Sequence, residues 1–443
     1  MGFIKPDLND KEKKVFILII SVSFLIKIFL AFFLQAPVRS DSYDYLNIAG
    51  NILKGEYSIY GKPTAYVGCG YPLFLSFVIY VFGEGQFYIR VVQSVLETGT
   101  GYLFFLVSRN FFNVKYSLIS IALFSFLPSN IIFSQAVLSE SLFGFFSMYL
   151  LYLLLRDDYK NRSSLIFLSG IIFGYAVLIR TAFLPALLLI PLYFFYKRKD
   201  LSGKNILTGA VKCSAIFAAG AFIMLAPWSI RNKLAVDTFS LGTTAGLNFW
   251  AGSNPDATGT YYNKMTEDLP FDFKNESERD REYFKLGFEY AKQNPLKYVI
   301  LGFKKIGYLY SSERMAVLYF TDAKPGETST QVYRSVNPLI LILVNVPYFI
   351  IILSGTWGLL ALKKKRFFIY GFILTWMFTV FIFVALARYH YVLIPFFVLG
   401  SVNFISERKN LFSELSLQKK TIGFGFSLFL ITVWTAELYL MLK

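Results

Sequence analysis

The chain has 443 residues, of which 55% are hydrophobic and 19% aromatic, and it carries a formal net charge of +16. Its mean hydropathy of +0.51 excludes an ordinary soluble domain, which is less apolar and much less aromatic. The positive charge does not indicate nucleic acid, because the basic residues lie in short links between apolar runs. Cys69 and Cys213 imply no disulfide framework, and a single histidine, His390, excludes a histidine-rich metal site.

Apolar runs of about 20 residues recur along the chain, which is the length that crosses the hydrocarbon core as a helix. Backbone groups in lipid must be satisfied within the segment, so these runs are helices. The sequence therefore predicts an all-α polytopic membrane protein with about 11 transmembrane helices. In chain order they span about 15–35, 88–107, 116–134, 139–155, 163–179, 181–196, 206–227, 337–362, 367–386, 389–405 and 421–441.

The basic links set the expected orientation. Lys11, Lys13 and Lys14 precede the first apolar run and place the N-terminus in the cytoplasm. The polar stretch 36–70 and the large polar region 229–332 then share the extracytoplasmic face. The abundance of Phe, Ile, Lys and Asn is typical of an AT-rich bacterial genome, so we expect an integral protein of the bacterial inner (cytoplasmic) membrane.

The two outer polar regions divide the chain. Residues 71–82 are apolar but too short to span, which predicts a helix at the interface. Residues 278–293 have the period of an amphipathic helix, and 296–310 suit a helix at the headgroups. The expected parts are an N-terminal transmembrane module at 1–228 with a catalytic first outer loop at 36–87, an extracytoplasmic region at 229–332, and a C-terminal transmembrane module at 333–443.

Basic residues on the outer side are informative because they depart from the positive-inside bias. Charges at membrane depth are costly and usually paired, so they are functional candidates. Several arginines at one depth require an anion, either a protein carboxylate or a lipid phosphate bound bidentately. Each basic residue on its own could instead anchor the protein at the lipid headgroups, whereas several of them together favour a functional site. The residues are Arg39, Arg90, Arg180, Arg231 and Arg388 near outer helix ends, and Lys62 in the first loop.

Two acids in the first loop are candidates for proton transfer. Asp41 and Asp44 are three residues apart, which places them on one face of a helix. A carboxylate there can act as general base, but an N-cap role is equally compatible. Glu140, at the outer start of a predicted helix, fits a cap or helix-dipole partner as well as a catalytic acid. Lys27, inside the first predicted helix, is interpreted as snorkelling toward the surface, and His390 as a structural interfacial residue.

Short motifs in a fixed order resemble the GT-C superfold glycosyltransferases, above all the protein O-mannosyltransferases (family 39) and the aminoarabinose-transferase-like enzymes. The resemblance covers about 15–260, with an isolated patch at 386–396. The motifs are Asp41-x-x-x-Tyr45, Gly70-Tyr-Pro-Leu-Phe-Leu75, Arg90-Val-Val-Gln93, Leu127-Pro128, Leu138-Ser-Glu140, Gly170…Gly174…Arg180, Pro227-Trp-Ser-Ile-Arg-Asn232, Gly246-Leu-Asn248 and Ala387-Arg-Tyr389.

The resemblance implies an inverting transfer from a polyprenyl-phosphate-linked sugar donor to a hydroxyl acceptor on the extracytoplasmic face. Asp41 matches the first-loop catalytic acid and is the expected general base; Asp44 and Glu140 are further catalytic candidates. The expected donor-phosphate ligands are Lys62, Arg180, Arg231 and Arg388. The expected substrate pocket holds Tyr45, Tyr60, Tyr66, Tyr71, Asn248, Tyr389 and His390.

Two positions depart from the family pattern. The family often has a second acid directly beside the first, whereas here Asp44 follows Asp41 at a distance. The Gly-Tyr-Pro segment is usually preceded by a basic residue and proline, but here Gly68-Cys69-Gly70 leads into it. Donor contacts made at that point in the family are therefore expected from Lys62 or Tyr66.

The chemistry requires a base on the acceptor hydroxyl and cations on the leaving phosphate, but no cofactor. A divalent cation is optional, and no residue is assigned to a metal. The expected partners are the lipid-linked donor, a protein, lipid or glycan acceptor, and the bilayer; nucleic acid is not expected. Two alternatives explain outer basic residues without this chemistry: a lipid-linked glycan flippase or other transporter, and a polysaccharide polymerase.

Overall fold

The computed structural model describes residues 8–34, 38, 41–197, 204–261, 275–321, 329–363 and 365–442, and this part is helical apart from one short hairpin. Six helical runs in it are long and apolar enough to cross a membrane. They are α1 (Asp10–Phe33), α4 (Gln86–Ser108), most of α10 (Lys204–Val236), α16 (Pro338–Ala361), the run Ala387–Glu407 formed by η3 (Ala387–Leu393) and α18 (Ile394–Glu407), and α20 (Leu417–Leu442).

Five other predicted spans fall on shorter apolar helices. These are α5 (Val114–Phe126), α7 (Glu140–Leu155), α8 (Ser163–Ile179), η2 (Thr181–Leu188) with α9 (Leu189–Lys197), and α17 (Arg366–Ile382). The predicted all-α class with membrane-spanning helices is therefore confirmed, and the number of eleven crossings stays a prediction. The apolar segment 71–82 forms α3 (Gly70–Phe82), and its expected position at the membrane interface stays a prediction.

A proline divides one of the predicted helices into two. The expected helix 116–134 is interrupted, because Leu127 leaves the helical conformation and Pro128 begins α6 (Pro128–Phe133). Proline suits a first helical position, where no backbone N–H is needed. Asn130 Nδ2 donates to the carbonyl oxygen of Phe124 at 2.8 Å, which satisfies one of the acceptors left at the end of α5.

The snorkelling interpretation of Lys27 is wrong. The side chain is only 1% exposed and its Nζ donates to Ser23 Oγ at 2.7 Å. Glu97 on α4 supplies a nearby opposite charge and accepts a hydrogen bond from the Tyr391 hydroxyl. Inside a bundle a charged group persists when it is paired in this way, so Lys27 ties α1 to its neighbours.

Glycines allow the closest helix pairs. A Cβ at Gly358 of α16 would lie 1.7 Å from the carbonyl oxygen of Gly400 on α18, and one at Gly170 of α8 would lie 2.0 Å from that of Phe217 on α10. Small residues let helix backbones approach within membranes, where apolar burial alone drives association weakly. These two contacts hold α16 close to α18 and α8 close to α10.

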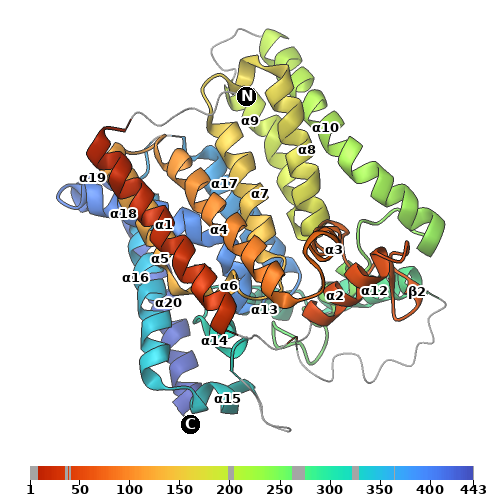
Figure 1. The fold of residues 1–443 in the computed structure, drawn as a ribbon. Coiled ribbons are helices and arrows are strands. Elements are labelled where there is room, and N and C mark those ends of the chain that lie inside the picture. The colour runs from red at the N-terminus through yellow and green to blue at the C-terminus, as the bar shows by residue number, and fades with distance from the viewer. Residues whose placement is uncertain are drawn as a thin grey trace.

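The short elements gather toward one end, seen in the lower part of Figure 1 together with the C-terminus. The hairpin pairs Ser58 with Pro63 and Ile59 with Lys62. From the first loop come α2 (Asp41–Ile52), β1 (Ser58–Ile59), β2 (Lys62–Pro63) and α3, and from the large polar region come α11 (Ala245–Ala251), α12 (Glu276–Gln293), α13 (Pro295–Leu309), α14 (Arg314–Leu318) and α15 (Ser329–Ser335). The expected helices at 278–293 and 296–310 correspond to α12 and α13.

The first loop and the large polar region contact each other. Thr243 N donates to Ala65 O at 2.9 Å, and Thr64 Oγ1 donates to Glu276 Oε2 at 2.8 Å. The Glu276 carboxylate also accepts the Ala65 amide. The two polar regions thus form one continuous structure at this end, as the shared-face prediction requires.

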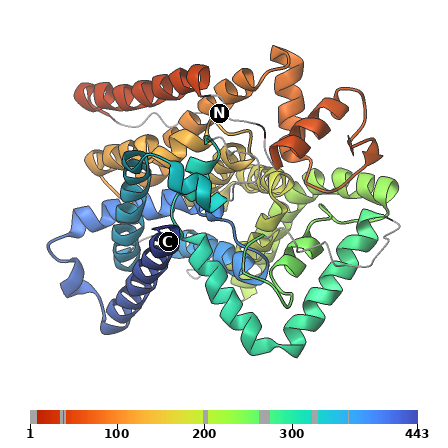
Figure 2. The same ribbon diagram turned by 90° about the horizontal axis from the view of Figure 1, so that it is seen from below.

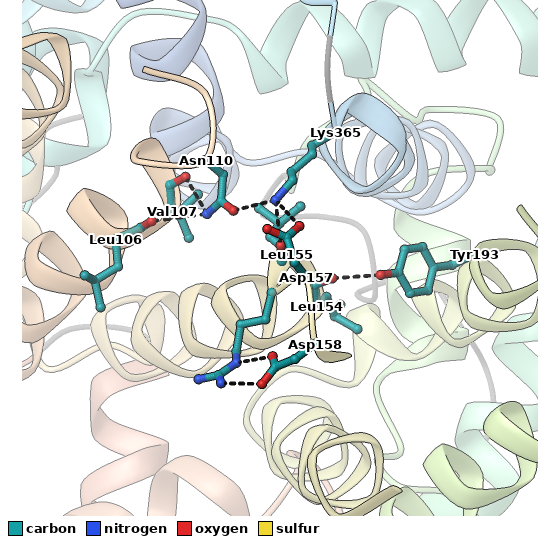
Figure 3. Close-up of polar contacts among 10 residues, drawn as sticks. Leu106, Val107, Asn110, Leu154, Leu155, Asp157, Asp158, Tyr193 and Lys365 are labelled. Atoms are coloured by element: carbon teal, nitrogen blue, oxygen red, sulfur yellow. Dashed lines mark hydrogen bonds and ion pairs between the residues drawn. The ribbon is translucent and has the colours of Figure 1, made fainter. Parts of the chain in front are cut away.

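The opposite end of the bundle is tied by side chains from the predicted cytoplasmic links, which also include η1 (Tyr159–Asn161) and α19 (Leu411–Glu414). Lys365 Nζ donates to Asn110 Oδ1 and to Asp157 Oδ1, both at 2.8 Å, and to Leu155 O at 3.1 Å (Figure 3). It therefore joins the ends of α4 and α7 to the start of α17. Tyr193 on α9 donates to Leu154 O at 2.9 Å beside it.

Candidate active site

The first turn of α2 carries both acids of the first loop. Asp41 begins the helix and Asp44 follows one turn later, as the three-residue spacing predicts. Asp41 keeps 40% of its side chain exposed. An exposed carboxylate at a helix start can meet a substrate from the polar end.

Three charged residues from distant parts of the sequence join Asp41. An Arg388 Nη atom donates to the Asp41 carboxylate, and Arg388 Nε lies 3.6 Å from Glu140 Oε1. Arg180 Nη2 lies 2.5 Å from the same Glu140 oxygen. We call Asp41, Glu140, Arg180 and Arg388 the Asp41 cluster; its charges alternate in the order Asp41, Arg388, Glu140, Arg180.

Each member is placed by the end of a helical segment. Asp41 begins α2, Glu140 begins α7, Arg180 directly follows α8, and Arg388 lies on η3. Glu140 at the first position of α7 is favoured by the positive end of the helix dipole. It is almost completely buried, and a buried carboxylate needs paired cations, which Arg180 and Arg388 provide.

Tyr389 and Tyr45 flank the Asp41 cluster. The centre of the Tyr389 ring lies 5.6 Å from Arg180 Cζ and 6.0 Å from Arg388 Cζ, within the range of cation–π attraction. Burial raises the pKa of Tyr45, whose neighbouring charges are those of the Asp41 cluster. Tyr45 also packs edge-on against Tyr71, with ring centres 4.8 Å apart. Tyr71 itself is fully buried and donates to Gln93 Oε1 at 2.7 Å, so it supports the site from within the core.

Asp44 faces the hairpin. It accepts a hydrogen bond from the Tyr60 hydroxyl at 3.3 Å. Burial raises the pKa of the Asp44 carboxyl above its usual value, the Tyr60 hydrogen bond opposes this shift, and the charge of Asp41 adds to it. Burial also raises the pKa of Tyr66 to about 12, and the charges of Asp44 and Asp41 act on it. Lys62 is exposed on β2 of the same hairpin.

Arg231 lies apart from the contacts of the Asp41 cluster. From α10 its guanidinium donates to the carbonyl oxygens of Thr64 at 2.5 Å and Tyr57 at 2.6 Å. The rings of Tyr57 and Trp228 lie 5.1 Å from its Cζ. The structure thus uses Arg231 to hold the backbone of the first loop, and its expected phosphate contact stays a prediction.

His390 and Asn248 have protein partners. His390 Nδ1 lies 3.1 Å from Leu309 O, and its Nε2 lies 3.2 Å from a Glu313 oxygen; both side chains are 1% exposed. These contacts agree with a structural role for His390 next to Arg388. Asn248 on α11 accepts a hydrogen bond from the Tyr261 hydroxyl.

Close packing accounts for the unusual Gly68-Cys69-Gly70. A Cβ at Gly68 would lie 2.2 Å from the carbonyl oxygen of Leu178, and one at Gly70 would lie 2.6 Å from the Ile179 amide nitrogen. The first loop therefore runs directly against the end of α8, where Arg180 follows. A basic residue and proline would not fit this approach.

The sequence did not predict two tyrosines that lie near the charges of the site. The charges of Asp41 and Arg388 act on both Tyr261 and Tyr319, and burial raises the pKa of both phenols. Neither tyrosine belongs to a motif, and the only signal was their place in the large polar region.

Arg90 donates to Leu34 O at the end of α1, whereas Arg39 lies outside the described residues.

The described residues contain no group of three or more His, Cys, Asp or Glu side chains that could hold a metal ion. Asp41 and Asp44 supply two carboxylates. A requirement for a divalent cation stays a prediction.

Comparison with known proteins identifies the type of fold. The family model of dolichyl-phosphate-mannose-protein mannosyltransferases matches residues 67–230. The oligosaccharyltransferase of Archaeoglobus fulgidus in its apo form superposes with a TM-score of 0.51 at 12% identity, over 94% of this chain and 55% of that one. The same enzyme tethered to an acceptor peptide with an NVT sequon gives 0.50 at 14% identity, over 94% and 54%. No curated protein matches this chain.

The chain spans about half the length of these solved structures. Because the sequence identity is low, the structural likeness establishes the fold alone. Residues 67–230 include α3, Arg90, Glu140 and Arg180, so the family match covers two members of the Asp41 cluster. The resemblance noted from the motifs is confirmed: the chain has the GT-C fold of membrane glycosyltransferases, and its residues 67–230 match the dolichyl-phosphate-mannose-protein mannosyltransferase family.

Proposed function

We propose that this protein moves a sugar from a polyprenyl-phosphate donor to a hydroxyl acceptor, with inversion at the anomeric carbon and with Asp41 as general base. The observation that carries the proposal is the contact between Asp41, the exposed acid of the Asp41 cluster, and Arg388, a cation suited to a phosphate. The family match and the fold support membrane glycosyl transfer in general.

The reaction needs one proton acceptor and one stabilised leaving group. Asp41 takes the proton of the acceptor hydroxyl while the hydroxyl oxygen forms the new bond to the anomeric carbon. The bond from that carbon to the phosphate oxygen breaks, and its electron pair leaves with the phosphate. The departing polyprenyl phosphate gains one negative charge, and cations stabilise developing charge best when they are already in place. Arg388 and Arg180 are the candidates.

Arg388 links the two halves of this reaction. Its guanidinium pairs with Asp41 and with Glu140. A donor phosphate that takes hydrogen bonds from Arg388 weakens its pairing with Asp41, and a carboxylate with a weaker counter-charge is a stronger base. Donor binding thereby activates the base. Glu140 stays buried between the two arginines and positions them.

The remaining predicted residues take supporting roles in this proposal. Tyr66 and Tyr389 lie beside the charges and contact the sugar or acceptor. Asp44, Tyr60 and Lys62 line the side formed by the hairpin. Since nucleotide sugars are cytoplasmic, a membrane-borne donor suits an extracytoplasmic site in the bacterial inner membrane, with the N-terminus in the cytoplasm.

The test uses the full chain in lipid nanodiscs, with polyprenyl-phosphate mannose as the first donor probe and other polyprenyl-phosphate sugars after it. Transfer of label to a hydroxyl acceptor, or to water, is expected with the wild-type chain and is lost in Asp41→Asn. Equal transfer by a correctly folded Asp41→Asn variant contradicts the proposal. Movement of lipid-linked sugar across vesicles with its glycosidic bond intact supports the transporter alternative instead.

A further inference from the structure

A cavity separate from the Asp41 cluster opens between α13 and α20. Its volume is about 420 Å³, within the range of small-molecule sites. Figure 2 shows α13, in teal, running toward the C-terminal helix α20, in dark blue. Its lining includes Phe303, Lys304 and Tyr308 of α13, Arg314 of α14, and Val433 and Ala436 of α20.

Exposed apolar side chains continue from the walls of the cavity over α13 and α20. On α13, Leu296, Ile300 and Phe303 are all at least 60% exposed, and Leu440 of α20 is 66% exposed. Helix α20 is long and apolar enough to span a membrane, and exposed apolar side chains on a spanning helix contact acyl chains. These side chains offer an apolar path along which an acyl chain could enter the cavity from a bilayer.

The polar end of the cavity is positively charged. Lys304 and Arg314 both line it, and the buried Nε of Arg314 has no hydrogen-bond partner in the described part of the chain. The lining also holds one acid, Glu437, which accepts the Ser312 amide at 2.8 Å and keeps its negative charge, so the two cations leave an excess of one positive charge. A buried guanidinium nitrogen without a partner favours an acceptor from outside the protein, and phosphate oxygens are the preferred partners of arginine.

We propose that this cavity binds an anionic phospholipid of the surrounding membrane. Its phosphate lies against Arg314 and Lys304, and its acyl chain lies along Val433, Ala436 and the neighbouring apolar residues of α20. No lining residue belongs to the Asp41 cluster, so this site is distinct from the donor site proposed above and does not depend on that proposal.

Helix α14 connects the cavity to the neighbourhood of the Asp41 cluster. Arg314 begins this helix at the cavity. Glu313, just before it, pairs with His390, and Tyr319, just after it, lies where the charges of Arg388 and Asp41 act. A lipid held by Arg314 therefore orders the segment that packs behind Arg388.

The experiment uses the full chain in phosphatidylcholine nanodiscs containing a photoreactive phosphatidylglycerol with a diazirine on its acyl chain. Crosslinked peptides are mapped by mass spectrometry. Label is expected on peptides containing 303–314 and 429–440, and unlabelled phosphatidylglycerol is expected to displace it. Arg314→Ala removes a charge-assisted contact and is expected to weaken this competition by about tenfold or more.

Three further variants test the cavity and control for folding and for general lipid contact. Ala436→Phe fills the cavity and leaves Arg314 in place, and is expected to lower labelling of both peptides to the level of other helices. Thr435→Phe, next to it on α20 but not lining the cavity, and Lys285→Ala, an exposed cation on α12, are expected to label like the wild type.

Three results would overturn the proposal. One is labelling spread over α1, α10 and α16 as strongly as over α13 and α20. Another is equal labelling by an uncharged diacylglycerol probe, which would show that no phosphate is recognised. The third is displacement by free inorganic phosphate, or by polyprenyl phosphate more strongly than by phosphatidylglycerol, which would assign the cavity to another ligand.

Discussion

Replacing Asp41 by Asn separates two effects that the site geometry links. Asn keeps the size of the side chain but cannot accept a proton. General bases contribute about 10² to 10⁴ in rate, which corresponds to about 3 to 5 kcal/mol of activation free energy. We therefore expect kcat to fall by about that factor.

The same substitution removes the Asp41 carboxylate from Arg388, so more of the guanidinium can bind the donor phosphate. Arg388 is buried but keeps Glu140 at 3.6 Å as a counter-charge, and Asp41 is 40% exposed, so the expected cost to the free energy of unfolding is about 1 to 3 kcal/mol. Since the Asp41 carboxylate no longer competes for Arg388, the donor KM is expected to stay unchanged or to decrease.

The assay measures initial transfer rates across donor concentrations in nanodiscs, with thermal unfolding as the folding control. Asp44→Asn is the matched control: it removes a neighbouring carboxylate from the same helix and is expected to change kcat by less than tenfold. A folded Asp41→Asn variant with a kcat within tenfold of wild type would contradict the general-base role of Asp41. A raised donor KM in this variant would contradict the sharing of Arg388 between Asp41 and phosphate.

Burial lowers the pKa of the Lys305 ammonium group from 10.5 to about 7. Between pH 7 and 10.5 the unfolded chain therefore binds more protons than the folded chain, and Tm is expected to rise with pH. Lys305→Met should flatten this rise in Tm, and an unchanged pH profile of Tm would contradict the lowered pKa. Gly68→Ala is expected to destabilise by about 1 to 3 kcal/mol because its Cβ meets backbone. Gly50→Ala, with nothing within 4 Å, is expected to be neutral or slightly stabilising; similar Tm losses for both would refute the packing argument. Arg231→Ala is expected to speed proteolysis of the first loop around Tyr57 as well as to raise the donor KM; a raised KM with unchanged proteolysis would favour a direct phosphate role.

Periodicity and charge predicted the helices well, because spanning lipid leaves a chain few choices. Proline shows where local signals fail. Pro128 starts a new helix after a break, whereas α10 continues through Pro227 to Val236. A proline removes one N–H in both cases, and only the surrounding helices decide whether the break is tolerated.

The site could be predicted as a set of residues but not as contacts. The sequence named Arg180, Arg231 and Arg388 alike, since all lie near outer helix ends. Only the path of the folded loops brings two of them to Glu140 and the third to the carbonyl of Thr64. Tyr319 could not be found at all, because its approach to Asp41 depends on the turn around α14.

The alternating charges of the Asp41 cluster bear on how quickly the enzyme proposed here can release its product. Two arginines and two carboxylates sum to no net charge. A phosphate gains the arginines only by displacing a carboxylate that stays within reach. When the reaction leaves the phosphate with its extra charge and Asp41 with a proton, loss of that proton to water restores the competing carboxylate. The returning charge then helps expel the spent lipid carrier, so the cluster favours turnover over tight retention.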